Sequence, residues 1–197
     1  VWNIWHGGRR FGKQVGVNRV IEVLKRENAD VIGLIETYGS GAIIADSLGY
    51  YFYLISSNLS IMSRYPIDET IQLFRSFNSG GALIRISEEQ QIAFYDIWLH
   101  YLPDVSDLNK GKAAVKKYEE DEAQTRIPEI REILKQMAPR TAQSAETPVI
   151  LVGDFNCDSH LDWNEQARPA HLGAFAKLEV SRQVLNEGFT DSFRHLY

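Results

Sequence analysis

The sequence contains a single cysteine, Cys157, and it lacks an apolar run long enough to cross a membrane. One cysteine cannot form an internal disulfide. A transmembrane helix needs about 20 consecutive apolar residues, and no basic segment followed by an apolar one opens the chain as a signal peptide would. We therefore expect a soluble protein without disulfides, and its compartment is not indicated.

Basic residues do not exceed acidic ones, because 21 Lys and Arg stand against 26 Asp and Glu and give a net charge of −5. A protein held on nucleic acid by bulk charge alone needs a strongly basic face, so the composition argues against that mode of binding. It leaves open an enzyme that acts on phosphodiesters through a metal ion. The length and the 44% hydrophobic content predict one globular domain over residues 1–197.

The hydrophobic pattern alternates between strands and helices at first and then becomes a series of hairpins. Strands are predicted over residues 1–5, 31–35, 50–55, 59–63, 67–74, 82–86, 91–99 and 149–152. Helices are predicted over residues 17–28, 42–48 and 119–137, with Pro128 kinking the start of the last one. Residues 138–148 are expected to form a surface loop. The pattern is that of an α/β protein.

Polar side chains lie in or directly after several of these apolar strands. Asn3 lies in the first one, and Glu36 and His100 each follow a strand directly. Asp154 and Asn156 come just after the strand predicted at 149–152. Because strand ends are where α/β enzymes commonly assemble their sites, these five residues are the candidates for a functional site.

The residue types in this set suit phosphoryl chemistry. Two carboxylates and an amide oxygen at the edge of a sheet offer the hard oxygen ligands that Mg²⁺ prefers, with water and a substrate phosphate in the remaining positions. A nearby histidine can act as a general acid or stabilise charge on a developing phosphorane. A metal-assisted phosphoesterase is the function that this combination favours.

Each residue taken alone also has a structural interpretation. Asn3 could cap an edge or a turn, and Glu36 could begin a helix, where carboxylates are favoured. Asp154 and Asn156 could form an Asx turn that leaves a strand, and His100 could be a hydrogen-bonded histidine of the core or its rim. Only the joint occurrence of the five favours a site.

The same residues lie in motifs that resemble a known family. The motifs are Trp-Asn-Ile-Trp at 2–5, Asp-Val-Ile-Gly-Leu-Ile-Glu at 30–36, Ser-Ile-Met-Ser-Arg-Tyr-Pro-Ile at 60–67, Trp-Leu-His at 98–100 and Gly-Asp-Phe-Asn at 153–156. They occur in the order found in the endonuclease/exonuclease/phosphatase superfamily, the deoxyribonuclease-I-like phosphoesterases. The resemblance spans essentially the whole chain, and the combination is far more specific than Gly-Asp-Phe-Asn alone.

This resemblance implies a fold, a metal and a role for each residue. The fold would be a four-layered α/β sandwich of two mixed sheets with flanking helices. Asn3 and Glu36 would lie at a Mg²⁺ site, with Glu36 a direct ligand and Mn²⁺ an alternative ion. Asp154 would orient or deprotonate the attacking water, Asn156 would hold the scissile phosphate, and His100 would hydrogen-bond the phosphate oxygens.

The end of the chain departs from the family. Members end with a further strand and a Ser-Asp-His-type motif, and they carry an upstream strand with an Asp, whereas this chain closes with Asp-Ser-Phe-Arg-His-Leu-Tyr at 191–197. His195 lacks an adjoining Asp, and Asp191 is itself interpreted as a cap or turn residue. We therefore expect a C-terminally truncated chain in which the last strands of the sandwich are missing. Loss of one member of a catalytic unit can remove most of the rate.

The expected activity of the intact enzyme is Mg²⁺-dependent hydrolysis of a phosphoester by in-line attack of water, with a nuclease as the first choice. A phospholipid or small-molecule phosphodiesterase is the first alternative, since an acidic chain does not require a nucleic acid substrate. An inert binding or structural module is the second, because the closing Asp and His are absent. The partner expected is thus a phosphodiester substrate, and the oligomeric state is not indicated.

Further segments could contribute to substrate binding. The loop from His6 to Arg10 could deliver His6, Arg9 or Arg10 to a phosphate, or be a plain surface loop. His160 or Trp163 could stack on a base or a lipid headgroup, or Trp163 could cap the core. Two other features have an alternative as well. Arg126 matches an arginine often found in the family or lies on a solvated helix face. The lysines of residues 110–117 could contact a polyanion, but they are interpreted as a solvated helix start.

Overall fold

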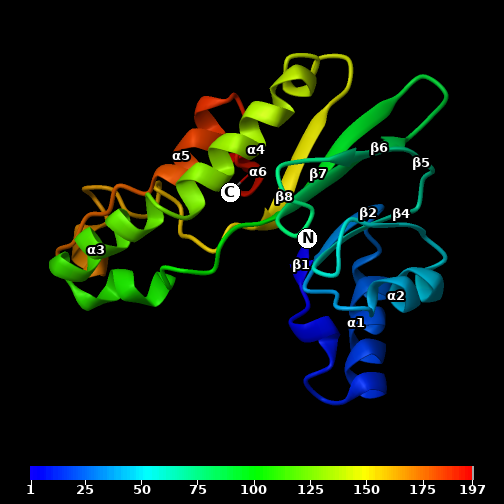
Figure 1. Ribbon diagram of the computed structural model, residues 1–197, viewed down its shortest axis with the longest axis horizontal. Coiled ribbons are helices and arrows are strands. Elements are labelled where there is room, and N and C mark those ends of the chain that lie inside the picture. Colours follow the sequence, from blue (N-terminus) through cyan, green and yellow to red (C-terminus); the bar gives the residue numbers. More distant parts are fainter. Residues whose placement is uncertain (197) are drawn as a thin grey trace. The chain divides into compact units, whose positions relative to one another are not determined.

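The structure is a computed structural model that describes residues 1–196 (Figure 1). These residues form two compact units. The first unit contains Val1–Trp98 and Gln136–Asp154, and the second contains Leu99–Lys135 and the residues from Phe155 onward. Helix α4 (Arg126–Thr141) contributes residues to both. Each unit is described by itself.

The first sheet of the first unit has four strands in the order β1-β2-β4-β3. Strands β1 and β2 are parallel, and the other two pairs are antiparallel. The bounds predicted for β2 and β4 are correct, and nearly all side chains of both strands are buried. The strands are β1 (Trp2–Asn3), β2 (Val31–Ile35), β3 (Tyr51–Leu54) and β4 (Leu59–Ser63).

The second sheet also has four strands, in the order β5-β6-β7-β8, and its last pair is parallel. Strand β8 runs two residues beyond its predicted end. Gly153 permits this, because a Cβ at that position would lie 2.2 Å from the carbonyl oxygen of Ile97 and its φ is 156°. The strands are β5 (Ile67–Gln72), β6 (Ser79–Arg85), β7 (Gln91–Trp98) and β8 (Val149–Asp154).

The two sheets pack face to face, with β2 and β4 against β6 and β7. One buried cluster between them consists of Ile61, Ala82, Ile84 and Phe94. Both sheets contain parallel and antiparallel pairs, so the prediction of an α/β sandwich of two mixed sheets is confirmed. Burial of these apolar side chains between two sheets is the main source of stability for such a sandwich.

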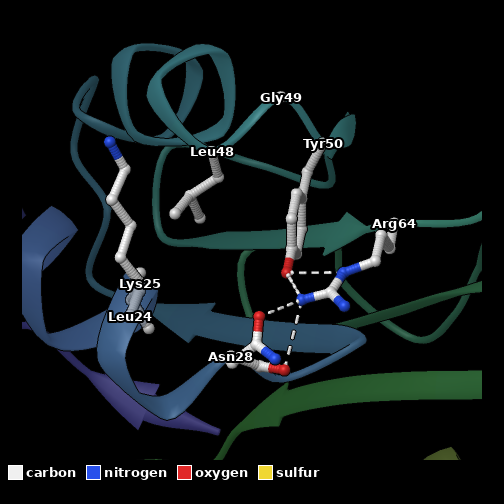
Figure 2. A pocket seen from close by; sticks show the side chains of 7 residues that line it. All are labelled: Leu24, Lys25, Asn28, Leu48, Gly49, Tyr50 and Arg64. Atoms are coloured by element: carbon white, nitrogen blue, oxygen red, sulfur yellow. Dashed lines mark hydrogen bonds between the residues drawn. The ribbon is translucent and has the colours of Figure 1, made fainter.

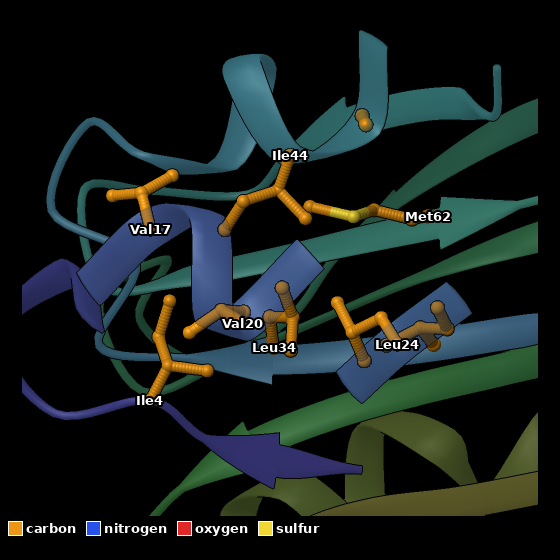
Figure 3. Close-up of a cluster of buried hydrophobic side chains, with 9 residues drawn as sticks. Ile4, Val17, Val20, Leu24, Leu34, Ile44 and Met62 are labelled. Carbon is orange, nitrogen blue, oxygen red and sulfur yellow. The ribbon is translucent and has the colours of Figure 1, made fainter. Parts of the chain in front are cut away.

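Helices cover the outer face of the first sheet. Helix α1 (Lys13–Glu27) and helix α2 (Gly41–Leu48) bury an apolar stripe against β2 and β4 (Figure 3). Each helix ends at a residue with positive φ, Asn28 or Gly49, as helix C-termini commonly do. On the second sheet, Arg140 of α4 forms an ion pair with Glu69 of β5 at 2.6 Å. The buried residues of Figure 3 are Ile4, Val17, Val20, Leu24, Ile32, Leu34, Ile44, Ala45 and Met62.

The second unit is built from helices and loops within the described residues. Its core consists of Leu108, Val115, Tyr118, Trp163, Ala174, Ala176 and Leu178. None of the helices in residues 1–196 is both long and apolar enough to span a bilayer. Besides the first part of α4, the elements are η2 (Val105–Lys110), α3 (Lys112–Glu122), η3 (Arg168–His171), α5 (Glu179–Asn186) and α6 (Ser192–Leu196).

Among the predicted elements, the first strand and the last helix differ most from the structure, and the other bounds, except those of β2 and β4, differ by one to four residues. The strand predicted over residues 1–5 ends at Asn3, and Trp5 is 48% exposed instead of lying in the core. The helix predicted over 119–137 is two helices, α3 and α4, and α4 continues into the expected loop as far as Thr141. Pro128 lies in the first turn of α4, where the missing N–H has no helical partner to lose, so it starts a new helix and does not kink an old one.

A buried carboxyl group lies between the sheets. Asp96 of β7 is fully buried, and it faces Gly33 of β2, where a Cβ would lie only 2.9 Å from the Asp96 Cγ. Neither carboxyl oxygen of Asp96 has a hydrogen-bond partner in residues 1–196. Burial raises the pKa of Asp96 well above its usual range.

We expect Asp96→Asn to stabilise the protein at neutral pH. A carboxyl whose pKa is raised in the folded state binds its proton more tightly there than in the unfolded chain, so its contribution to stability is greatest below about pH 4 and is lost as the pH rises. The free energy of unfolding of Asp96→Asn should therefore exceed that of the parent at pH 7, and the gap should narrow toward pH 4. Urea denaturation at several pH values measures this difference in the free energy of unfolding. A difference that does not change with pH would contradict a raised pKa of Asp96.

Candidate active site

Three of the predicted site residues meet in the first unit. Asn3 ends β1, Glu36 directly follows β2, and Asp154 is the last residue of β8. The Asn3 Nδ2 donates hydrogen bonds to Glu36 Oε1 at 3.1 Å and to Asp154 Oδ2 at 2.9 Å. The two carboxylate oxygens are therefore separated by no more than the sum of these distances, although the residues are far apart in the sequence.

The orientation of the Asn3 amide is set by its own backbone neighbour. Its Oδ1 accepts a hydrogen bond from the Trp5 N–H at 2.9 Å, so the nitrogen faces the carboxylates. The resemblance to the family implied that Asn3 lies at a metal site, and that role stays a prediction. In this geometry Asn3 holds two negatively charged groups together by donating to both.

Glu36 is fixed from its backbone and its side chain. Its φ is 58°, a left-handed conformation that is uncommon outside glycine. Its N–H donates to Asn58 Oδ1 at 3.2 Å, and its Oε2 accepts from the His6 N–H at 3.0 Å. These two contacts hold the carboxylate in the direction of Asn3.

Asn58 lies between the strands predicted at 50–55 and 59–63, and it supports Glu36. It is fully buried, and its Nδ2 donates to the Phe77 carbonyl oxygen at 3.0 Å while its Oδ1 accepts from Glu36. A buried amide with both ends hydrogen-bonded positions its neighbours strongly. The sequence carried no signal that distinguishes this buried Asn from an exposed turn residue.

The loop after Asn3 packs on the segment after Glu36. Arg9 Nη1 donates to the Tyr38 carbonyl oxygen at 2.8 Å, and the Ser40 hydroxyl donates to the Gly7 carbonyl oxygen at 2.7 Å. The rings of His6 and Tyr38 stack with centroids 5.9 Å apart. Partial burial, with Glu36 as a second cause, raises the pKa of Tyr38. Arg9 therefore has a structural role, whereas His6 and Arg10 are exposed.

His100 and Asn156 lie in the second unit, each two residues beyond the end of its strand, β7 or β8. Asn156 has a φ of 51°, and its Nδ2 donates to the Leu99 carbonyl oxygen at 2.9 Å. The His100 N–H donates to Glu129 Oε2 at 2.8 Å, and its Nδ1 lies 3.1 Å from both the N and the O of Leu102. These bonds fix the two residues within their own unit.

Arg126 is fully buried, so the alternative of a solvated helix face is wrong for it. Its Nη1 donates to the carbonyl oxygens of His100 at 3.1 Å and Pro103 at 3.0 Å. Its Nε donates to Glu122 Oε1 at 3.1 Å, and its Nη2 donates to the Tyr118 hydroxyl at 2.6 Å. Burial raises the pKa of Glu122 although Arg126 acts against it. Arg126 thus anchors the loop that carries His100.

The remaining predicted features have structural roles. Trp163 is buried, donates from Nε1 to Asp158 Oδ2 at 2.9 Å and stacks on His171, so it caps the core and is not a stacking platform. Asp191 Oδ1 accepts from the N–H of Arg194 at 3.2 Å, as expected for a cap of α6. The helix surface expected for the lysines is confirmed where Lys117 pairs with Asp121 one turn later on α3.

A pocket of about 330 Å³ in the first unit shares no residue with the candidate site (Figure 2). One of its two cationic residues, Arg64, already donates to the Asn28 side chain and to the Tyr50 hydroxyl, and it forms an ion pair with Asp30. An anion at Arg64 would have to compete with these partners, and none of the predicted site residues lines the pocket. It is lined by Leu24, Lys25, Asn28, Leu48, Gly49, Tyr50 and Arg64.

The donor set at the candidate site is small. Within residues 1–196 no three His, Cys, Asp or Glu side chains gather as metal ligands would, and the site offers the two carboxylates of Glu36 and Asp154. That set could hold a cation only if water or substrate completed its coordination.

We expect Arg126→Met to destabilise the protein by about 3–5 kcal/mol, because it leaves the Glu122 carboxylate buried without its charge partner. The matched control is Arg131→Met on the same helix, whose exposed side chain should cost no more than about 0.5 kcal/mol. Adding Glu122→Gln to Arg126→Met should recover part of the loss. Urea denaturation measures all three, and equal effects of the two Arg substitutions would contradict the role of Arg126.

Comparison with solved structures agrees with the fold. An AP endonuclease from Archaeoglobus fulgidus matches with a TM-score of 0.60 at 14% identity, over 91% of this chain and 68% of that one. The human nocturnin catalytic domain with a bound sulfate anion matches with a TM-score of 0.55 at 14% identity, over 80% and 62%. TDP2 from Caenorhabditis elegans matches with a TM-score of 0.53 at 15% identity, over 79% and 45%.

Sequence comparison finds a similar curated protein and a matching family description. The relative, Uncharacterized protein F14F9.5 of Caenorhabditis elegans, is 26% identical over 206 residues, which cover all of this chain and 65% of that protein. This chain therefore spans about two thirds of the relative's length. The family description Endonuclease/Exonuclease/phosphatase family matches residues 1–194. With a match over nearly all of its length, the chain belongs to the endonuclease/exonuclease/phosphatase family.

Proposed function

We propose that this chain is the catalytic part of a divalent-metal-dependent phosphoesterase, and that it acts as a nuclease which hydrolyses phosphodiester bonds by in-line attack of water. The observation that carries the proposal is the convergence of Glu36 and Asp154 on the amide of Asn3. Two carboxylates held by a shared donor at adjoining strand ends give a compact negative site. Membership of a family of phosphate-ester hydrolases supports the same reaction class.

The donor set fits Mg²⁺ or Mn²⁺ better than zinc. Mg²⁺ is commonly bound through one or two carboxylates while water and substrate phosphate fill its octahedron, whereas a catalytic zinc site needs three protein ligands. A carboxylate oxygen has two lone pairs, so a hydrogen bond from Asn3 does not by itself exclude a metal ion from the same oxygen. When bound, the ion would offset the negative charge that develops on the phosphate.

Each residue then has a separate task. Glu36 would be the direct ligand, because the Asn58 and His6 contacts already orient its carboxylate. Asp154 would hold the attacking water and accept its proton, while Asn3 keeps the two acidic groups in place. For His100 and Asn156 the proposal rests on the family resemblance, in which they hydrogen-bond the oxygens of the scissile phosphate.

The two alternatives differ from the nuclease in a measurable way. The net charge of −5 suits a small-molecule or phospholipid phosphodiesterase as well as a nuclease. An inert module would fail to hydrolyse any phosphodiester. Because the chain spans only 65% of its curated relative, turnover should be assayed both on this chain and on a C-terminally extended form.

We expect Glu36→Gln and Asp154→Asn each to lower the rate of phosphodiester hydrolysis at least 100-fold, the order of magnitude attributed to one general base or metal contact. Chelation with EDTA should abolish turnover, and Mg²⁺ or Mn²⁺ should restore it. Bis(p-nitrophenyl) phosphate gives the readout. The matched control is Asp46→Asn, an exposed acid of α2 that should retain the parent rate. Parent rates in Glu36→Gln or Asp154→Asn would refute the proposed site.

A further inference from the structure

We propose that Trp5, His6 and Arg10 form a binding surface for a nucleobase of single-stranded nucleic acid, beside the carboxylates of the candidate site. This inference rests on the proposed function, because it names the substrate class of that site. The three residues are called the Trp5 surface below. They follow Asn3 directly and lie in the first unit.

The Trp5 ring is unusually exposed for its type. The residue is 48% exposed, whereas tryptophan is highly buried on average. Its described ring contacts are with the His6 ring, 5.1 Å between centroids, and with the Arg10 guanidinium, 4.9 Å from the Trp5 centroid. A large aromatic ring left on the surface beside a cation is the combination that single-strand-binding proteins use, with stacking on the ring and charge for the backbone.

The backbone of this surface is held in an unfavourable conformation. Trp5 and His6 both have a φ of 49°, and for residues with a side chain the left-handed region costs roughly 1 kcal/mol or more each. The conformation persists because the two N–H groups are bound, that of Trp5 by Asn3 Oδ1 and that of His6 by Glu36 Oε2. Site residues therefore hold the exposed rings at a fixed place next to Glu36.

The charges around the surface favour a polyanion, in contrast to the protein as a whole. The first 21 residues contain Arg9, Arg10, Lys13 and Arg19 and no acidic residue, although the net charge of the chain is −5. Arg10 and Arg19 both lie over the Phe11 ring, with guanidinium carbons 6.0 and 5.6 Å from its centroid. Neither forms an ion pair with a carboxylate within the described part of the chain. Arg10 is thus available to a phosphate.

An exposed Trp5 ring beside the Arg10 guanidinium favours one substrate class among those considered for the site. A phospholipid headgroup or a sugar phosphate has no aromatic face to stack on Trp5, and in a duplex the base faces are covered by their neighbours. A single strand presents both an open base and a phosphate at the spacing of one nucleotide. Stacking on an aromatic side chain contributes about 1–3 kcal/mol per base.

The experiment compares two oligomers that share a backbone, an oligothymidylate and an oligomer of the same length built from abasic tetrahydrofuran residues. Binding to the 197-residue chain is measured by fluorescence anisotropy at fixed salt, without added metal. Trp5→Ala should lower the ratio of the two affinities, thymidylate over abasic, by about 5-fold to 150-fold, and Trp5→Phe should restore most of it. Arg10→Gln should weaken both oligomers alike and lower the salt dependence by about one phosphate contact.

The matched control is Tyr51→Ala, an exposed aromatic residue of the same unit on the opposite edge strand, which should leave the affinity ratio unchanged. An unchanged ratio in Trp5→Ala, or failure of the parent to bind oligothymidylate, would overturn the Trp5 surface. Phosphodiester hydrolysis that depends on Glu36 but not on Trp5 would keep the proposed function and reject this inference. Trp5-dependent binding, with no hydrolysis by either this chain or its C-terminally extended form, would support the surface and reject the enzyme.

Discussion

The hydrogen bonds of the Asn3 amide are the interaction on which the candidate site depends. Asn3 lies on the first sheet, Asp154 lies on the second, and one amide nitrogen joins them while also holding Glu36. Two carboxylates repel each other, and a shared donor offsets part of that cost at neutral pH. The same bonds tie the edge of one sheet to the edge of the other, so the packing of the sandwich and the chemistry of the site share one contact.

The site is supported by residues that never need to touch a substrate. Asn58 holds the backbone of Glu36, and Gly153 allows β8 to run close enough to β7 to end at Asp154. In the second unit Arg126 binds the carbonyl oxygen of His100. Strands fix the Cα positions of a site formed from strand ends, but they leave its side chains several rotamers. The order of the site therefore depends on supporting contacts of this kind.

The two units distribute stability differently. The first buries its apolar side chains between two sheets and under α1 and α2, with the single buried acid Asp96 as a local cost. The second has a small apolar core that includes Trp163 and a buried ion pair between Arg126 and Glu122. Buried ion pairs contribute less to stability than to the uniqueness of an arrangement, which suits a unit whose loops carry His100 and Asn156.

The sequence by itself determined the strands of the core, the family motifs and the residue types of the site. The continuous apolar run at 31–35, for example, predicts a buried strand, because a strand that is buried on both faces is apolar along its whole length. The sequence could not determine where α3 ends and α4 begins. Amphipathic spacing continues through residues 123–125, and the position of a break depends on what the helix packs against.

Tertiary structure alone decided which way the polar groups face. The amide of Asn3 turns its nitrogen to the carboxylates because the Trp5 N–H needs the oxygen, and Trp163 is buried because Asp158 accepts its indole N–H. Arg126 is buried for a comparable reason, since two carbonyl oxygens and a carboxylate surround it. Some of these partners lie within five residues of the side chain and others lie more than 20 residues away, and only the folded structure decides which of them is used.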